Sequence, residues 1–144
     1  MAGYSGTPLA KKLGIKPGAR LALDRAPPGW AVPDLPQGVV PAGDAEPADV
    51  IVAFFRETAE LPERLPALAR RIFPAGGLWL AWPRKAGGHS SDITENGLRD
   101  HALPLGVVDN KVAAIDDDWS GLRVVWRLEH RSGSTPRATG PGPR

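Results

Sequence analysis

The chain has 144 residues, of which 42% are hydrophobic and 24% charged, as in one globular domain. It contains no Cys, which excludes disulfides and thiolate metal sites. Its longest apolar runs, Val50–Phe55 and Leu78–Trp82, are far too short to span a bilayer, and its N-terminal segment lacks the apolar core of a signal peptide. We therefore expect a cytoplasmic protein without a membrane partner.

The positive charge is concentrated at the C-terminal end of the chain. The net charge is +2, and residues 129–144 carry Arg131, Arg137 and Arg144 against the single acidic residue Glu129. The preceding body is therefore neutral, which makes nucleic-acid binding unlikely. Residues 130–144 are rich in Gly, Pro, Ser and Thr and have no apolar periodicity. We predict a single α/β domain over residues 1–129 and a disordered basic tail over 130–144.

The N-terminal third of the chain predicts short elements between long connections. Pro8 and Gly14 suit the start and stop of a helix over Pro8–Leu13. Pro17 and Gly18 then turn the chain into a strand at Arg20–Leu23, and a Pro- and Gly-rich stretch follows with a short strand at Val39 and Val40.

A buried strand and a helix occupy the middle of the chain. Val50–Phe55 is a continuous apolar run, which is typical of a strand covered on both faces. Apolar residues at helical spacing follow it: Leu61, Leu65, Leu68 and Ile72. Because an interior proline breaks the hydrogen-bond ladder, Pro62 and Pro66 predict that the regular helix covers only Arg64–Phe73.

The C-terminal half predicts a second central strand, a helix and two more strands. Leu78–Trp82 is apolar on both faces, and a helix can begin at Asp92 or Thr94 and continue through Leu103. Strands at Val107–Ile115 and Leu122–Leu128 are joined by a short loop, so they should pair antiparallel. The pattern predicts a reduced Rossmann-like, three-layer sheet of about five strands, mostly parallel with an antiparallel C-terminal edge pair.

In an open α/β sheet, ligands bind outside the carboxyl ends of the parallel strands. Four cations, three Trp and one acid stand at or near those ends and form the candidate ligand site: Asp24, Arg25, Trp30, Arg56, Trp82, Arg84, Lys85 and Trp119. Such an edge suits a small anionic ligand, with a ring that could stack, or a protein partner. The alternative is that these loops simply carry solvated charge.

Other polar clusters give weaker signals. Residues 89–92 (HSSD) could hold a nucleophile and base, yet no GxSxG elbow is present and a surface loop is the simpler interpretation. Asp116, Asp118, Ser120 and Gly121 match the opening of a calcium loop, but Arg127 stands where the bidentate Glu is needed. We predict no catalytic residues and no metal site.

Four ordered blocks of the sequence resemble an uncharacterised bacterial family, domain-of-unknown-function family 3052. The blocks are YSGTPLAKKLGIKPG (Tyr4–Gly18), GGLWLAWPRKAGG (Gly76–Gly88), DITENGLRDHALPLGVVDNKV (Asp92–Val112) and WSGLRVV (Trp119–Val125). The resemblance implies a small cytosolic bacterial protein with no known activity.

A second resemblance is to the C-terminal half of class I S-adenosylmethionine methyltransferases. A helix, the turn and strand FPAGGLWLAWP (Phe73–Pro83), a helix and a closing strand pair are similar to that half. The first half departs from the family, because the turn after Leu23 is DRAPPGW, with no glycine-rich loop and two prolines that supply no amide donors. No cofactor is therefore predicted.

The residues together favour a non-catalytic binding or regulatory module that holds a small anionic ligand or a protein partner at the carboxyl edge of the sheet. The alternative is a degenerate S-adenosylmethionine-dependent methyltransferase, and only under that alternative is S-adenosylmethionine the cofactor.

Overall fold

The computed structural model describes residues 8–131 of the chain. No helix among these residues is long and apolar enough to cross a membrane. The elements in chain order are α1 (Leu9–Leu13), β1 (Arg20–Asp24), β2 (Val40–Pro41), β3 (Val50–Phe54), α2 (Glu60–Arg71), β4 (Gly77–Pro83), the 3-10 turn η1 (Lys85–Gly87), α3 (Glu95–Ala102), the 3-10 turn η2 (Leu103–Leu105), β5 (Val107–Ala114), β6 (Trp119–Trp126) and α4 (Leu128–Arg131).

The six strands form one mixed sheet in the order β2-β1-β3-β4-β6-β5. The first four are parallel, and β6 runs antiparallel to both of its neighbours. This confirms the predicted Rossmann-like class with an antiparallel C-terminal pair. Each of the six strand segments expected from the sequence overlaps a strand of this sheet, and β6 lies inside the sheet while β5 forms the edge. The inner place suits β6 because Leu122 and Val124 are fully buried there.

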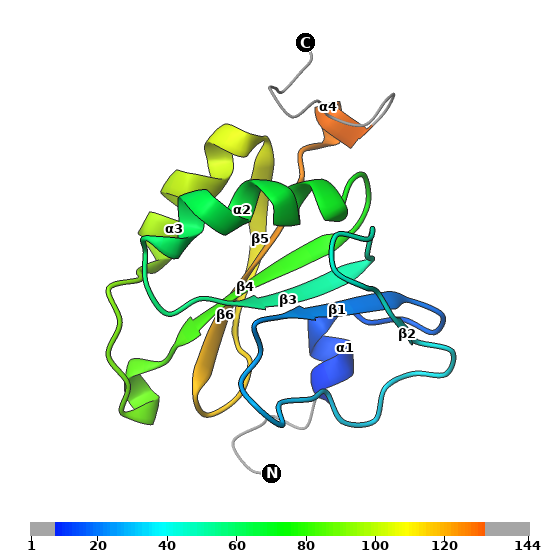
Figure 1. The fold of residues 1–144 in the computed structure, drawn as a ribbon, viewed down its shortest axis with the longest axis horizontal. Helices are drawn as coiled ribbons and strands as arrows, with labels where there is room; N and C mark the ends of the chain where they lie inside the picture. The colour runs from blue at the N-terminus through cyan, green and yellow to red at the C-terminus, as the bar shows by residue number, and fades with distance from the viewer. Residues whose placement is uncertain (1–7, 132–144) are drawn as a thin grey trace.

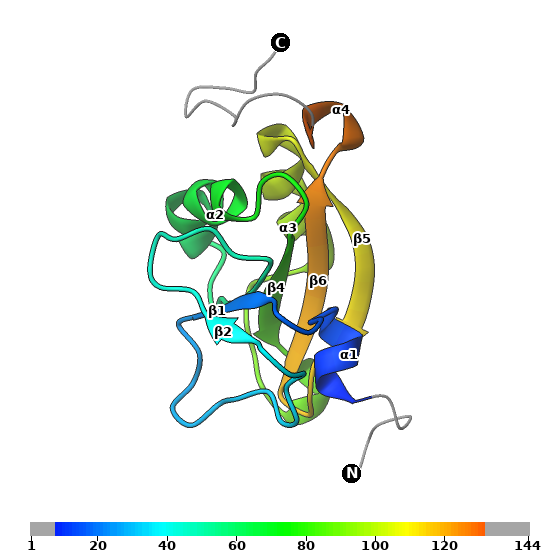
Figure 2. The ribbon, with the colours of Figure 1, turned by 90° about the vertical axis from the view of Figure 1, so that its right-hand side faces the viewer.

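The sheet is the middle of three layers (Figures 1 and 2). The helices α2 and α3 cover one face, and α1 lies on the other. On β4, Leu78 and Leu80 pack toward α2 and α3, whereas Trp79 and Ala81 pack toward α1, as the alternation predicts. The indole Nε1 of Trp79 donates to the Leu13 carbonyl at 3.0 Å, which fixes the short α1 to the sheet.

The helix α2 begins four residues earlier than the two prolines predict. Pro62 is its third residue, where a missing N–H costs nothing because the first-turn N–H groups of a helix have no partner inside it. Pro66 lies inside the helix and removes one ladder bond. The apolar face of α2 offsets this loss, because Leu61, Leu65 and Leu68 are all buried against the sheet.

The first two residues of the predicted C-terminal tail lie within the described part of the chain. His130 and Arg131 belong to α4, and Arg131 Nε donates to the Trp126 carbonyl at 2.8 Å. The ring of His130 meets that of Trp126 edge-on, with centroids 6.1 Å apart. The rest of the predicted tail, residues 132–144, lies outside the described residues.

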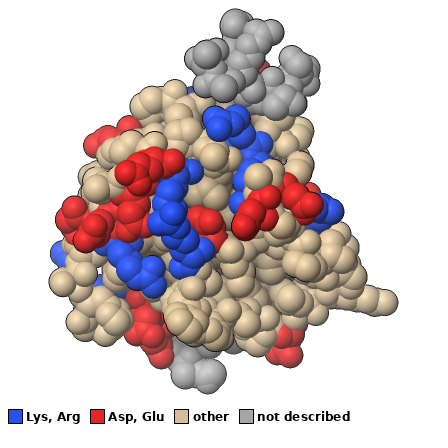
Figure 3. Space-filling model, viewed as in Figure 1, with Lys and Arg blue, Asp and Glu red and all other residues tan. Residues whose placement is uncertain are grey.

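Charged side chains of both signs are intermingled on the face shown in Figure 3. Several charged side chains of the protein are paired near the ends of the strands, such as Arg20 with Glu46 at 2.8 Å. Asp49 accepts the backbone N–H of Arg20 at 2.9 Å. This face therefore has no field of a single sign that would attract a polyanion over a wide area.

Candidate functional site

The loops that follow β1, β3 and β4 and precede β6 meet at one edge of the sheet, which we call the carboxyl edge. The strand order reverses between β1 and β3, since β2 lies on one side of β1 and β3 on the other. In open α/β sheets the ligand crevice lies at this switch point, outside the carboxyl ends of the two strands.

The switch point is closed by Arg64 of α2, which is only 8% exposed. Its Nη1 donates to the Phe54 carbonyl at 2.8 Å and to Glu60 Oε1 at 2.6 Å, and its Nη2 is paired with Asp24. Its guanidinium lies over the ring of Phe55, 4.0 Å from the centroid, while Nε is buried without a hydrogen-bond partner. Asp24 is therefore committed to an internal ion pair.

The backbone donors that follow β3 are also occupied by a group of the chain itself. Glu60 Oε2 accepts the N–H groups of Arg56 and Glu57, each at 2.9 Å. Burial raises the pKa of Glu60, but these two hydrogen bonds and the positive charge of Arg64 outweigh it and hold the pKa below its ordinary value. The Glu60 carboxylate thus takes the place that a bound anion could otherwise fill.

Trp30 packs into the same region from the turn after β1. Its ring meets that of Phe54 edge-on at 4.9 Å, and Phe54 meets Trp119 in the same way at 4.9 Å. Trp30 Nε1 donates to Asp116 Oδ2 at 2.9 Å. Asp116 Oδ1 accepts the backbone N–H groups of Asp118 and Trp119 at 2.8 and 2.9 Å. The aromatic cluster and Asp116 together fix the β1 turn to the loop before β6.

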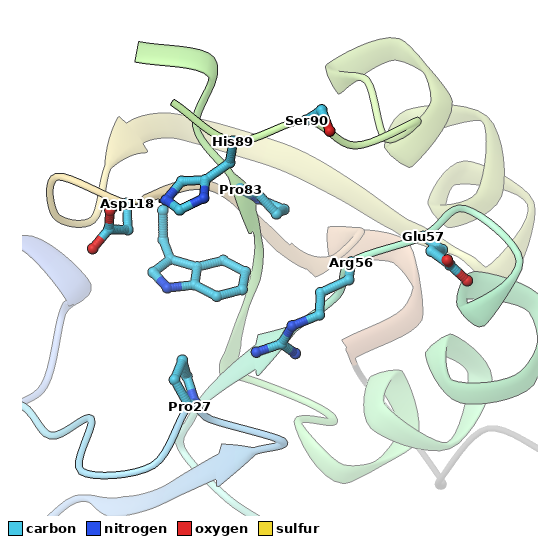
Figure 4. A pocket seen from close by; sticks show the side chains of 8 residues that line it. Pro27, Arg56, Glu57, Pro83, His89, Ser90 and Asp118 are labelled. Atoms are coloured by element: carbon cyan, nitrogen blue, oxygen red, sulfur yellow. Dashed lines mark hydrogen bonds and ion pairs between the residues drawn. The ribbon is translucent and has the colours of Figure 1, made fainter. Parts of the chain in front are cut away.

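An open cleft of about 480 Å³ lies beside this closed region, on the side of β4 and β6. We call it the Arg56 cleft, and Figure 4 shows the side chains around it. Its lining residues are Pro27, Arg56, Glu57, Pro83, His89, Ser90, Asp118 and Trp119.

Arg56 is the exposed cation of this cleft. Its Cζ lies 5.1 Å from the centroid of the Trp119 ring, so the guanidinium is held by a cation–π contact. Among residues 8–131 the Arg56 side chain makes no hydrogen bond or ion pair, which leaves its N–H donors available. In Figure 4 this side chain extends toward Pro27, whereas Glu57 points the opposite way.

The polar loop at residues 89–92 fastens neighbouring loops to one another. His89 Nε2 lies 2.9 Å from Asp118 Oδ1, at the rim of the cleft. Ser91 Oγ donates to the Arg56 carbonyl at 2.7 Å, and Asp92 Oδ1 accepts a backbone N–H of the loop before α2 at 2.8 Å. The hydroxyl of Ser91 is therefore engaged with the backbone and does not face a His base.

The remaining residues of the expected ligand site do not converge on the Arg56 cleft. Trp82, Arg84 and Lys85 line a second hollow of about 340 Å³ on the other side of Pro83. Arg84 Nη1 is also bonded to the Asp116 carbonyl at 2.9 Å. Arg25 is exposed, has a positive φ of 57°, and lines neither hollow. The structure thus divides the predicted rim of four cations into separate places.

The sequence did not reveal the roles of Glu60, Arg64 and Asp116 in organising this edge. Glu60 and Arg64 carry opposite charges four residues apart, a spacing at which helical side chains meet, and this signal was readable. Asp116 stands two and three residues before the N–H groups it accepts, as an Asx turn requires. The pairing of Arg64 with Asp24 joins residues 40 positions apart, and no local pattern indicates it.

The half calcium motif that begins at Asp116 is not arranged to coordinate a metal ion. Both carboxylate oxygens of Asp116 are used inside the fold, by Trp30 and by two backbone N–H groups. Within residues 8–131 no group of three His, Asp or Glu side chains could hold a metal ion.

No family model matches the chain, and no curated protein matches it. Solved structures similar to it include Aeropyrum pernix fibrillarin with bound S-adenosyl-L-methionine, at 16% identity over 81% of this chain and 73% of that one, TM-score 0.49. Magnesium protoporphyrin IX methyltransferase from Synechocystis is 10% identical over 83% and 74% of the two chains, TM-score 0.48. A possible exported protein from Bordetella parapertussis is 15% identical over 82% and 65%, TM-score 0.47.

These similarities concern the fold and carry no argument about activity. Folds of the class I methyltransferase kind are among them, as the second sequence resemblance implies. Membership of domain-of-unknown-function family 3052 stays a prediction. The Rossmann-like architecture rests on the sheet order and strand directions described above.

The residues at the switch point do not fit S-adenosylmethionine. Asp24 and Glu60 are paired with Arg64, Trp30 is bonded to Asp116, and no glycine-rich loop follows β1. A cofactor placed there by the general rule for open α/β sheets would have to displace a buried ion-pair network.

Proposed function

We propose that the chain is a cytoplasmic, non-catalytic binding or regulatory module that holds a small anionic ligand in the Arg56 cleft. The observation that carries the proposal is the Arg56 guanidinium, which stands over Trp119 with its hydrogen-bond donors available at a hollow of about 480 Å³. Pockets of this volume are typical of small-molecule sites.

The chemistry of the lining favours a compact acidic group. A guanidinium presents a planar fork that can bind a carboxylate or a phosphate with two parallel hydrogen bonds. Trp119 is only 8% exposed, so its ring orients Arg56 and offers little surface to a ligand. Pro27 and Pro83 supply rigid apolar walls, and Glu57 and Asp118 disfavour a ligand that spreads negative charge along the cleft.

The polar groups around the cleft support binding without catalysis. His89 has Asp118 as its partner, and Figure 4 shows the Ser90 side chain away from the His89 ring. Ser91, which does not line the cleft, is bonded to a backbone carbonyl. A nucleophile activated by a neighbouring base, which covalent catalysis requires, is not assembled from these side chains.

A thermal-shift screen tests the proposal on the purified full chain. Nucleotides, S-adenosylmethionine and coenzyme A are each added at about 1 mM, and a compound that binds the folded state raises the melting temperature by about 2 °C or more. Arg56→Gln should abolish the rise, while Arg70→Gln, an exposed arginine of α2 away from the cleft, should keep it. The proposal is contradicted if no compound raises the melting temperature, or if the melting temperature of Arg56→Gln rises as much as that of the wild type.

Two alternative functions make different predictions. A protein partner at the same edge predicts that a partner captured by the full chain is lost on Arg56→Gln. A degenerate methyltransferase predicts saturable S-adenosylmethionine binding that is lost on Asp24→Ala. No contact at the switch point favours the methyltransferase alternative, because Asp24 is already paired with Arg64.

A further inference from the structure

A second group of arginines lies at the opposite end of the sheet from the Arg56 cleft. Arg123 of β6 pairs across the strands with Trp79 of β4 and Lys111 of β5. Directly opposed residues of antiparallel strands share a face, so Arg123 and Lys111 lie on the α1 side with Trp79. In Figure 2 the short α1 covers only the lower part of β5 and β6, and on this face of the sheet no described helix lies over their upper part.

The Arg123 guanidinium rests against the backbone of Gly77 at the start of β4. A Cβ added at Gly77 would lie 2.5 to 2.7 Å from the Nη2, Nε and Cζ atoms of Arg123. Any side chain at position 77 would therefore displace the guanidinium. Glycine at this position lets a half-buried cation lie directly on the sheet.

Arg123 has no partner for its charge in the described part of the chain. Its side chain makes no hydrogen bond or ion pair with any of residues 8–131. Burial lowers the pKa of Arg123, and the positive charge of nearby Arg131 lowers it further. A desolvated cation beside a second cation is unfavourable on its own, and an anion between them would remove the cost.

Arg131 is held in position by the fold. Its Nε donates to the Trp126 carbonyl, and this bond leaves the two Nη groups for other acceptors. Because Leu78 pairs with Val124, Gly77 is level with Val125 of β6, so the Arg123 guanidinium at Gly77 lies one residue along the strand from the carbonyl that holds Arg131. Lys111 adds a third positive charge to the same face, where its Nζ donates to the Lys12 carbonyl at 3.3 Å.

We propose that Arg123 and Arg131 form a binding site for a phosphate group, separate from the Arg56 cleft. Two guanidiniums can neutralise a dianion and satisfy its oxygens with several charge-assisted hydrogen bonds. A single carboxylate would neutralise only one of the two charges, so phosphate fits better than a monoanion. The site is formed by the amino end of β4, the middle of β6 and α4, and none of these residues lines the Arg56 cleft.

Inorganic phosphate titrated into the purified full chain at constant ionic strength tests this proposal. The melting temperature of the wild type should rise by about 2 °C more in phosphate than in chloride. Arg123→Gln should weaken phosphate binding about tenfold, because it removes one charged set of donors. Arg131→Gln should weaken it as well and serves if Arg123→Gln folds poorly. Circular dichroism checks that each variant is folded.

Two further variants separate this site from others. Arg127→Gln changes an exposed arginine close by in the chain and should leave the phosphate effect unchanged. Arg56→Gln should also leave most of it. The proposal is overturned if phosphate and chloride act alike on the wild type, if folded Arg123→Gln and Arg131→Gln keep the full shift, or if Arg56→Gln alone removes it.

Discussion

Arg64 and Arg123 show two opposite uses of an arginine in the same sheet. Arg64 is buried at the carboxyl edge, where Asp24, Glu60 and the Phe54 carbonyl surround its Nη groups. Arg123 is half-buried toward the amino edge and has no acceptor within residues 8–131. The first completes the fold by closing the crevice in which a Rossmann-like sheet normally holds its ligand. The second leaves a charge that no residue of the range 8–131 neutralises.

The comparison indicates that ligand binding by an arginine depends less on its position in the sheet than on whether acceptor groups of the chain already surround it. Arg56 stands two residues beyond the end of β3, yet its side chain has no acceptor among residues 8–131, because Glu60 is already occupied by Arg64 and two backbone N–H groups. Ligand binding is therefore expected where the chain has not provided its own counter-charge.

The largest effect is expected from Arg64→Ala. The substitution leaves the carboxylates of Asp24 and Glu60 unpaired at a part-buried site, so we expect a loss of about 3–5 kcal/mol in the free energy of unfolding. Urea denaturation measures it, with Arg70→Ala on the exposed side of the same helix as the control. A loss no greater than that of the control would show that the ion-pair network does not stabilise the fold.

Glu60→Gln should lower the free energy of unfolding by a smaller amount, about 2 kcal/mol at neutral pH. Glu60 accepts two backbone hydrogen bonds and pairs with Arg64, and the substitution weakens these interactions. The folded-state pKa of Glu60 lies below its unfolded value, so its stabilisation is present above about pH 4.3 and is lost as the pH falls through the folded pKa. The wild type should therefore approach the variant in stability as the pH is lowered. A difference that stays constant with pH would contradict the lowered pKa.

Trp30→Phe should cost about 1 kcal/mol, because it removes the hydrogen bond from the indole to Asp116 while a ring still meets Phe54. Asp116 keeps its two backbone N–H donors, so the turn itself should persist. Chemical denaturation measures the loss, and amide spectra of the loop before β6 show whether the turn is kept. A collapse of that loop would mean that Trp30 builds the turn, contrary to this account.

The smallest effect, of opposite sign, is expected from Arg123→Leu. Removing a desolvated cation that has a like charge nearby should leave stability in phosphate-free buffer unchanged or raised by up to about 1 kcal/mol. The same urea series measures it beside Arg64→Ala. A loss above about 2 kcal/mol would show that Arg123 has a stabilising role in the fold and would weaken the contrast.

Local sequence patterns were sufficient to predict most of the helices and strands. The double-faced apolar runs at β3 and β4 lie where they were predicted; β3 is buried throughout, and β4 is buried from Gly77 to Ala81. The start of α2 was predicted too late because Pro62 and Pro66 were given more weight than the leucines at helical spacing, whose packing outweighs one missing hydrogen bond. The position of β6 between β4 and β5 depends on long-range pairing that the chain order does not display.

The candidate site could be predicted only in part. The rule that ligands bind at the carboxyl edge pointed to Arg56 and Trp119, which do come together. It could not show that Asp24 is paired with Arg64, because that contact depends on how α2 packs over β1 and β3. Nor could it separate Lys85 from Arg56, because the side of Pro83 on which each one lies is a property of the folded loop.

The most direct test follows the side-chain Nε–H resonances of Arg56, Arg64 and Arg123 by nuclear magnetic resonance while inorganic phosphate is added. We predict that the Arg123 signal shifts saturably, that the Arg56 signal also shifts as the small anion enters its cleft, and that the Arg64 signal stays in place because its surroundings are already filled. A shift of the Arg64 signal with Arg56 and Arg123 unmoved would contradict the division of this sheet into one closed and two open arginine sites.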